Sequence, residues 1–106
     1  PDGADVLCEA LKDYENITAI IGVMKDKNYH EVLEKTLPLC KRVICVKPNV
    51  PRALAAEELA QEAKKYCSDV LVVENIDDVL LLLDNNPTFI FGSLYLASEI
   101  RPLLRR

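Results

Sequence analysis

The stretch ITAIIGVMKDKNYHEVLEK, residues 17–35, determines how the rest of the chain is interpreted. Its first part, residues 17–23, is a continuous apolar run rich in β-branched residues, which is typical of a strand covered on both faces. Three charged residues, 25–27, follow this run at once. Asn28, with Glu31 three positions later, has the form of a helix start, and apolar residues continue at helical spacing as far as a proline. The stretch therefore predicts a buried strand, a charged loop and a helix.

The same alternation of strand and helix runs through the whole chain. The sequence predicts further strands at residues 42–46, 69–73 and 88–92, and further helices at residues 2–14, 55–67, 76–84 and 93–101. Asn75 is placed to cap the helix at 76–84, and Pro102 is placed to end or kink the last helix. Strict alternation implies right-handed crossovers, so we expect a mostly parallel sheet with helices on both faces.

Length and composition restrict the class of protein. A chain of 106 residues is long enough for one domain, and 50% hydrophobic with 28% charged residues is ordinary for a globular domain. The net charge of −4 argues against a nucleic-acid surface. No N-terminal leader and no apolar run of bilayer length is seen, and VLLLLD (79–84) reads as a buried helix. We therefore expect a cytoplasmic domain that binds neither nucleic acid nor membrane.

The cysteines and the histidine bear on redox state and metal binding. Cys8, Cys40, Cys45 and Cys67 lie mostly within apolar patterns and form no CxxC pair. We expect four free thiols in a reducing compartment rather than disulfides or a metal site. His30 is the only histidine, so the spacing offers no ligand set for a Cys/His zinc cluster.

Loops that follow the strands are the candidate binding segments, because open parallel sheets bind ligands at the carboxyl ends of their strands. Three such loops are predicted: GVMKDKN (22–28), VKPNVPRA (46–53) and FGSLYL (91–96). The chain contains neither GxGxxG nor GxxxxGK[ST], and its single histidine makes a Ser-His-Asp or Cys-His grouping untenable. We therefore expect no catalytic residue and no self-contained nucleotide cradle in this chain.

Each candidate side chain has a structural and a functional interpretation. The charged residues 25–27 form either a solvated loop or a loop that binds a charged ligand. Arg52 either pairs with the acidic residues 57–58 or binds a ligand. Ser93 has the position of an N-cap for the last helix, where a carboxylate can also bind, and Tyr95 has the position of a core residue.

Four segments carry a resemblance to a known family. They are PDGADVLCEAL (1–11), GVMKDKNY (22–29), PNVPRALAAEEL (48–59) and GSLYLASEIR (92–101). In this order and spacing they resemble the C-terminal domain of folylpolyglutamate synthase/dihydrofolate synthase, in the Mur ligase family. The resemblance spans essentially the whole chain, and GSLYL followed by Glu-aliphatic-Arg, together with M-x-D-K, is specific to the folate branch. It implies a three-layer, Rossmann-like α/β domain over residues 1–106.

The chain also departs from the family pattern. The family's Asp-Gly-Ala-His-Asn segment, which immediately precedes Pro-Asp-Gly, is absent, and the chain opens on a helix instead of a strand. We therefore expect a fragment of a larger enzyme that lacks the family's first strand. Asn28 replaces the acidic residue usual after Asp-Lys, and Pro102 interrupts a final helix that normally runs on. Val50 stands where the diaminopimelate-adding Mur ligase has the Asn of its Asn-Pro-Arg loop.

The resemblance implies a function for the full-length enzyme. ATP, with Mg²⁺, would phosphorylate a folate γ-carboxylate in a preceding ATPase domain, and the amine of L-glutamate would then attack the acyl phosphate. The present domain would position the glutamate. On this resemblance the expected glutamate-binding residues are Asp26, Lys27, Arg52, Ser93 and Tyr95.

Two other functions stay open at the level of sequence. One is a dihydrofolate synthase that adds only the first glutamate, since recognition of dihydropteroate, dihydrofolate or tetrahydrofolate would lie largely outside this chain. The other is a non-catalytic α/β module that binds a small ligand or a protein.

Overall fold

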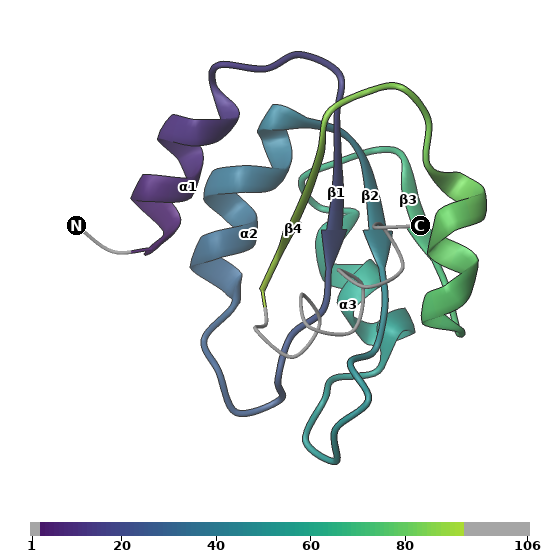
Figure 1. The fold of residues 1–106 in the computed structure, drawn as a ribbon. Helices are drawn as coiled ribbons and strands as arrows, with labels where there is room; N and C mark the ends of the chain where they lie inside the picture. Colours follow the sequence, from purple (N-terminus) through teal and green to yellow (C-terminus); the bar gives the residue numbers. More distant parts are fainter. Residues whose placement is uncertain (1–2, 93–106) are drawn as a thin grey trace.

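The computed structural model describes residues 3–92 and shows strands alternating with helices along the chain (Figure 1). The elements are α1 (Gly3–Leu11), β1 (Ile17–Ile21), α2 (His30–Thr36), η1 (Leu37–Leu39), β2 (Cys40–Cys45), α3 (Ala56–Ala63), β3 (Val70–Val72), η2 (Ile76–Leu82) and β4 (Thr88–Phe91), where η marks a 3₁₀-helix. The predicted last helix at 93–101 lies outside the described residues. None of the described helices is long and apolar enough to cross a membrane.

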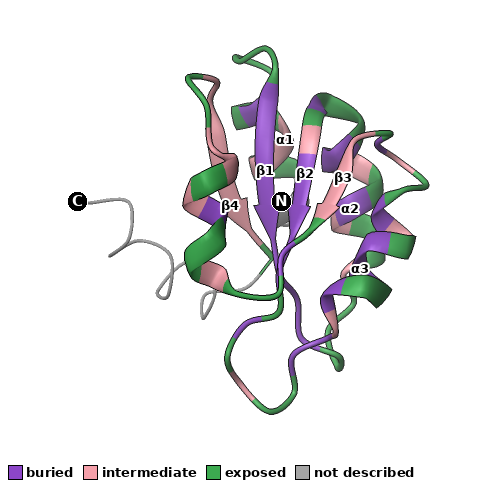
Figure 2. Cartoon of the chain, turned by 90° about the vertical axis from the view of Figure 1, so that its right-hand side faces the viewer, coloured by how far each residue is buried: buried purple, intermediate pink, exposed green. Residues whose placement is uncertain are grey.

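The four strands form one sheet in the order β3-β2-β1-β4, and every pair is parallel. In the centre, Ile20 of β1 lies opposite Ile44 of β2 on one side and Ile90 of β4 on the other. All five residues of β1 are buried, whereas β4 is half-buried (Figure 2). The strand pairing confirms the predicted parallel sheet. The burial shows that β1, the strand predicted from residues 17–23, lies in the interior of the sheet.

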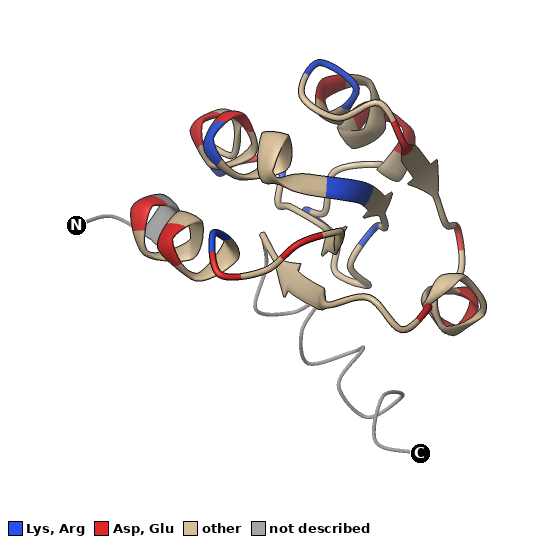
Figure 3. Ribbon diagram, turned by 90° about the horizontal axis from the view of Figure 1, so that it is seen from above, with Lys and Arg blue, Asp and Glu red and all other residues tan. Residues whose placement is uncertain are grey.

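Side chains of β1 divide alternately between the two faces of the sheet. Ile17, Ala19 and Ile21 pack in one core cluster with residues of α1, α2 and α3. Ile20 packs in a second cluster with Val79 of η2. Three helices therefore cover one face and η2 lies on the other, which confirms the expected three-layer arrangement (Figure 3).

The segment predicted as a buried helix at 76–84 forms a 3₁₀-helix instead. Three residues per turn bring Ile76, Val79 and Leu82 to one side, and all three belong to the second core cluster. Leu81 points away from that side and is 80% exposed, so the segment predicted as a buried helix is buried on one side only. The predicted cap is confirmed, because Oδ1 of Asn75 accepts a hydrogen bond from the backbone N–H of Asp77 at 3.0 Å.

The predicted start of α2 at Asn28 is also wrong. The N-cap is Tyr29, which has helical backbone angles and makes no side-chain capping hydrogen bond. The ring of Tyr29 packs against the first core cluster, and its carbonyl accepts from the backbone N–H of Leu33 at 3.1 Å. Packing of the aromatic ring therefore selects the start of the helix over the better capping chemistry of Asn28.

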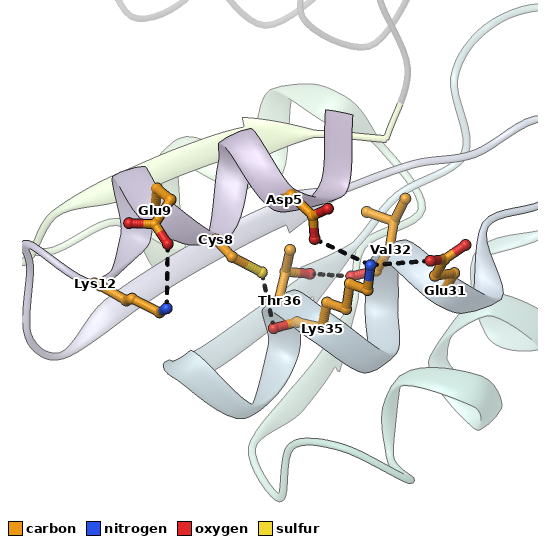
Figure 4. Close-up of polar contacts among 8 residues, drawn as sticks. All are labelled: Asp5, Cys8, Glu9, Lys12, Glu31, Val32, Lys35 and Thr36. Carbon is orange, nitrogen blue, oxygen red and sulfur yellow. Dashed lines mark hydrogen bonds and ion pairs between the residues drawn. The ribbon is translucent and has the colours of Figure 1, made fainter. Parts of the chain in front are cut away.

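Helix α1 packs beside α2, and polar contacts link their outer sides (Figure 4). Lys35 Nζ lies 3.0 Å from Asp5 Oδ1 and 2.9 Å from Glu31 Oε1. The Cys8 thiol donates to the carbonyl of Lys35 at 3.1 Å. Ion pairs this exposed contribute little, so burial of Leu11 is the main force that holds α1 in place.

All four cysteines are free thiols in the structure, as the sequence predicts, and three of them are buried. Burial, followed by the nearby Cys67, raises the pKa of both Cys40 and Cys45 to about 12. These two thiols therefore stay protonated at neutral pH and behave as small apolar side chains of the core.

Candidate functional site

Because the strands are parallel, their carboxyl ends share one edge of the sheet, the lower edge in Figure 1. Two loops leave this edge side by side. The β1 loop, residues 22–29, connects β1 to α2, and the β2 loop, residues 46–55, connects β2 to α3. This is the edge at which open parallel sheets bind ligands.

Backbone hydrogen bonds join the two loops into a short antiparallel ribbon. The N–H of Lys25 donates to the carbonyl of Arg52 at 2.8 Å, and the N–H of Leu54 donates to the carbonyl of Val23 at 2.9 Å. Between these bonds, Met24 and Ala53 form an antiparallel bridge. Val23, Met24, Ala53 and Leu54 are all buried, so the ribbon is anchored in the core of the domain. The charged side chains therefore project from a fixed backbone.

Asp26 and Arg52 meet across this ribbon. Arg52 Nη1 lies 2.8 Å from Asp26 Oδ2, and the two side chains are 74% and 48% exposed. The expected structural partner of Arg52 was Glu57 or Glu58, and this alternative is wrong. The ribbon sets Arg52 opposite Lys25 and hence beside Asp26, a neighbour that local spacing within residues 52–58 does not reveal.

Lys27 lies next to this pair in a turn closed by its own N–H and the carbonyl of Met24 at 3.3 Å. Its side chain is exposed and has no ion-pair partner among residues 3–92. Within the same part of the chain, Lys25 and Lys47 at this edge are likewise exposed and without an acidic partner. The β1 and β2 loops thus carry more positive charge than Asp26 neutralises.

Two glycines allow the strand exits to approach each other closely. A Cβ at Gly22 would lie 2.9 Å from Cδ of Pro48, which belongs to the β2 loop. A Cβ at Gly92, whose φ is +99°, would lie 2.7 Å from the carbonyl oxygen of Gly22. The end of β4 therefore lies against the start of the β1 loop. The predicted site residues Ser93 and Tyr95 come directly after it but lie outside the described residues.

An open cleft of about 820 Å³ lies at the same edge, between the β2 loop and the segment that connects β3 to η2. Its charged lining residues are Lys47, Glu74 and Asp77, and Pro48 and Pro51 contribute rigid walls. None of these five residues was predicted as a site residue. Lys47 directly follows the apolar run of its strand, as does Glu74, so the rule that sites follow strands could have identified both.

The charged side chains at this edge can bind an anion. A guanidinium group and exposed ammonium groups are the side chains that bind carboxylates, and Arg can do so with two parallel hydrogen bonds. No group of three or more His, Cys, Asp and Glu side chains within residues 3–92 could hold a metal ion. Asp26, Lys27 and Arg52 thus lie on two adjacent, hydrogen-bonded loops at one edge of the sheet.

Comparison with known proteins identifies the family. Residues 1–86 match the family model described as "Mur ligase, glutamate ligase domain". The folylpolyglutamate synthase of Lacticaseibacillus casei is 34% identical over 110 residues, which cover 98% of this chain and 25% of that protein. The chain therefore spans about a quarter of the length of this curated relative.

Solved structures agree with this assignment. The crystal structure of folylpolyglutamate synthase from Thermotoga maritima matches with a TM-score of 0.83 and 31% identity, over 97% of this chain and 25% of that one. The Mycobacterium tuberculosis folylpolyglutamate synthase complexed with ADP matches with a TM-score of 0.83 and 24% identity, over 98% and 28% of the two chains. The family match covers most of the sequence and the fold agrees with that of both solved structures, so this chain belongs to the glutamate ligase domain family of the Mur ligases.

Proposed function

We propose that this chain is the C-terminal domain of an ATP-dependent folylpolyglutamate synthase, and that its β1 and β2 loops bind the incoming L-glutamate. Support for the enzyme comes from the curated relative and the solved structures, which carry that name and of which this chain matches about a quarter. Support for the site comes from one observation. Lys27 and Arg52 lie together on two hydrogen-bonded loops at the carboxyl edge of a parallel sheet.

Glutamate carries two carboxylates and one amine. Lys27 and Arg52 supply cations for the carboxylates, and the anchored ribbon fixes the backbone from which these two side chains extend. Holding both reactants in the right geometry converts an encounter in solution into a positioned step. The role of this domain is therefore to present the amine of glutamate to an activated folate carboxylate held by the rest of the enzyme.

The solved M. tuberculosis folylpolyglutamate synthase is complexed with ADP. The resemblance of the present chain to this family implies that the full-length enzyme uses ATP and Mg²⁺. The residues of this chain do not fit that requirement by themselves. The sequence has no GxxxxGK[ST] loop, and residues 3–92 offer no group of acidic, histidine or cysteine side chains for a metal. In this proposal, nucleotide and metal bind mainly to the part of the enzyme outside this chain.

The proposal is tested with Lys27→Ala and Arg52→Ala in the full-length enzyme that carries this chain. A charge-assisted contact to a carboxylate is worth about 1.5–3 kcal/mol, so each variant should weaken use of glutamate by about ten- to a hundredfold. The KM for ATP should change little, because the nucleotide binds elsewhere. Lys41→Ala is the matched control, since Lys41 is an exposed lysine at the start of β2, on the opposite edge of the sheet.

Assays with dihydropteroate and with a reduced folate distinguish addition of the first glutamate from chain extension. Loss of both activities in the two variants supports a shared glutamate site. If both variants keep the wild-type KM for glutamate and the wild-type turnover, the loops are solvated segments and the proposed site is wrong.

A further inference from the structure

One contact at the edge conflicts with simple anion binding. Asp26 contributes a carboxylate to a surface that is proposed to hold carboxylates, and it lies 2.8 Å from Arg52, the strongest anion-binding group there. A negative charge beside a bound carboxylate costs free energy through repulsion. Direct contact between Asp26 and a glutamate carboxylate is therefore unfavourable, and the aspartate needs another explanation.

The position of the Arg52 backbone is already fixed by its neighbours. Its carbonyl accepts from the N–H of Lys25, and its neighbour Ala53 is fully buried and bridged to Met24. What the backbone leaves undetermined is the long side chain, which is 74% exposed and has many rotamers in solution. Asp26 is the acidic residue that the structure places within hydrogen-bonding distance of this guanidinium group.

The contact uses only part of the guanidinium group. Arg52 donates through Nη1 to Oδ2 of Asp26, whereas a guanidinium group has five N–H donors in a rigid fork. The high exposure of the side chain leaves the other donors open to a ligand. One carboxylate can thus orient the fork while a second carboxylate binds it.

From this geometry we propose that Asp26 is a positioning residue for Arg52. Its carboxylate holds the guanidinium group so that the remaining N–H donors meet a carboxylate of the amino-acid substrate. This inference rests on the proposed function and deepens it, because it gives Asp26 a role that acts through Arg52. It predicts that the ion pair survives binding rather than being displaced by the ligand.

The central test is a double-mutant cycle in the full-length enzyme. Asp26→Asn should raise the KM for glutamate by about two- to fivefold, as expected for loss of an exposed ion pair, and leave the KM for ATP unchanged. In the Arg52→Ala background the same substitution should have no further effect, because the group that it orients is gone. Asp26→Glu, which keeps the charge, should recover part of the loss. Asp13→Asn, an exposed acid-to-amide change before β1, is the control.

Exchanging the two charged residues distinguishes a role of Asp26 in positioning Arg52 from a role of the ion pair in joining the two loops. Asp26→Arg combined with Arg52→Asp retains an ion pair across the ribbon and should retain the thermal stability of the wild type. It moves the guanidinium group to the wrong loop, so the KM for glutamate should stay high. Full recovery of glutamate use by this exchange would show that the pair only joins the loops, and the proposal would be overturned.

The outcomes also separate this inference from the proposed function. If Lys27→Ala and Arg52→Ala both leave glutamate use unchanged, the proposed site itself fails, and if Arg52→Ala alone does so, the positioning role of Asp26 fails. If Arg52→Ala raises the KM but Asp26→Asn does not, or if the two effects simply add, the site stands and only the positioning role of Asp26 fails.

Discussion

At the scale of single residues, Gly92 has little freedom to change. Its φ of +99° is a conformation that L side chains rarely adopt, and a Cβ there would lie 2.7 Å from the carbonyl oxygen of Gly22. The obstacle is backbone at the exit of β1, which cannot rotate away as a flexible side chain could. Gly92 therefore keeps the end of β4 against the proposed binding loops.

We expect Gly92→Ala to lower the free energy of unfolding by about 1–3 kcal/mol, because it introduces a strained backbone conformation together with a steric clash. Urea denaturation with a measured midpoint and slope tests this. Asn16→Gly is the control, since Asn16 also has a positive φ, 56°, which glycine adopts freely. The control should stay within about 0.5 kcal/mol of the wild type. An equally small effect of Gly92→Ala would contradict the close contact at the exit of β1.

Single residues also show where sequence reasoning stops. The candidates Asp26, Lys27 and Arg52 were selected because their loops follow strands and because the loops resemble those of a known family, and the structure places the two loops side by side. The pairing of Asp26 with Arg52 could not be predicted, because these residues are 26 positions apart and meet only through the ribbon between the loops. Spacing along the sequence favoured the acidic residues after Arg52 as its ion-pair partners. The tertiary structure instead brings Asp26 to Arg52.

At the scale of elements, periodicity predicted whether most segments are strands or helices, but not whether a helix is an α-helix or a 3₁₀-helix. The strands were recognisable as short β-branched runs, and their alternation with helical patterns required parallel pairing. The run VLLLLD fits either an α-helix or a 3₁₀-helix by hydrophobicity alone. The choice depends on which residues the second core cluster admits, and that depends on β1 and β2, far away in the sequence.

The cap of η2 gives a test at this scale. Asn75→Ala removes the side-chain oxygen that accepts from the N–H of Asp77, and we expect a loss of about 1 kcal/mol in the free energy of unfolding. Asn75→Asp, which keeps an accepting oxygen, should lose much less. Because Asn75 also lines the open cleft, both variants should be measured by chemical denaturation without ligand. Equal losses in the two variants would show that the hydrogen bond is not what stabilises the turn.

At the scale of the whole molecule, charge and topology act together. The chain carries a net charge of −4, and acidic residues lie on each of α1, α2, α3 and η2 (Figure 3). Lys25 and Lys27 on the β1 loop and Lys47 on the β2 loop add exposed positive charge at the carboxyl edge, where Glu74 and Asp77 also line the cleft. The strand order β3-β2-β1-β4 brings these loops together, and it could not be read from the sequence because it depends on long-range pairing.

The same view leads to a prediction for the chain by itself. On the proposed function, the β1 and β2 loops provide only half of an active site, because the second reactant and its activating group must approach from outside. The sequence has no phosphate-cradling loop, and the described part has no grouping of side chains that could hold a metal. We therefore expect the isolated chain neither to hydrolyse ATP nor to join glutamate to a folate.

Purified chain is assayed for phosphate release from ATP with Mg²⁺, with and without glutamate and a reduced folate. The expected rate of phosphate release is that of buffer without protein. Lys27→Ala and Arg52→Ala should leave this rate unchanged, because they affect only glutamate binding. A circular dichroism spectrum of the same sample, with the helix and strand signals of the fold, shows that the inactive chain is folded. ATP turnover above the buffer rate that disappears on substituting a residue of this chain would mean that it contains catalytic groups, and the division of labour proposed for the enzyme would be wrong.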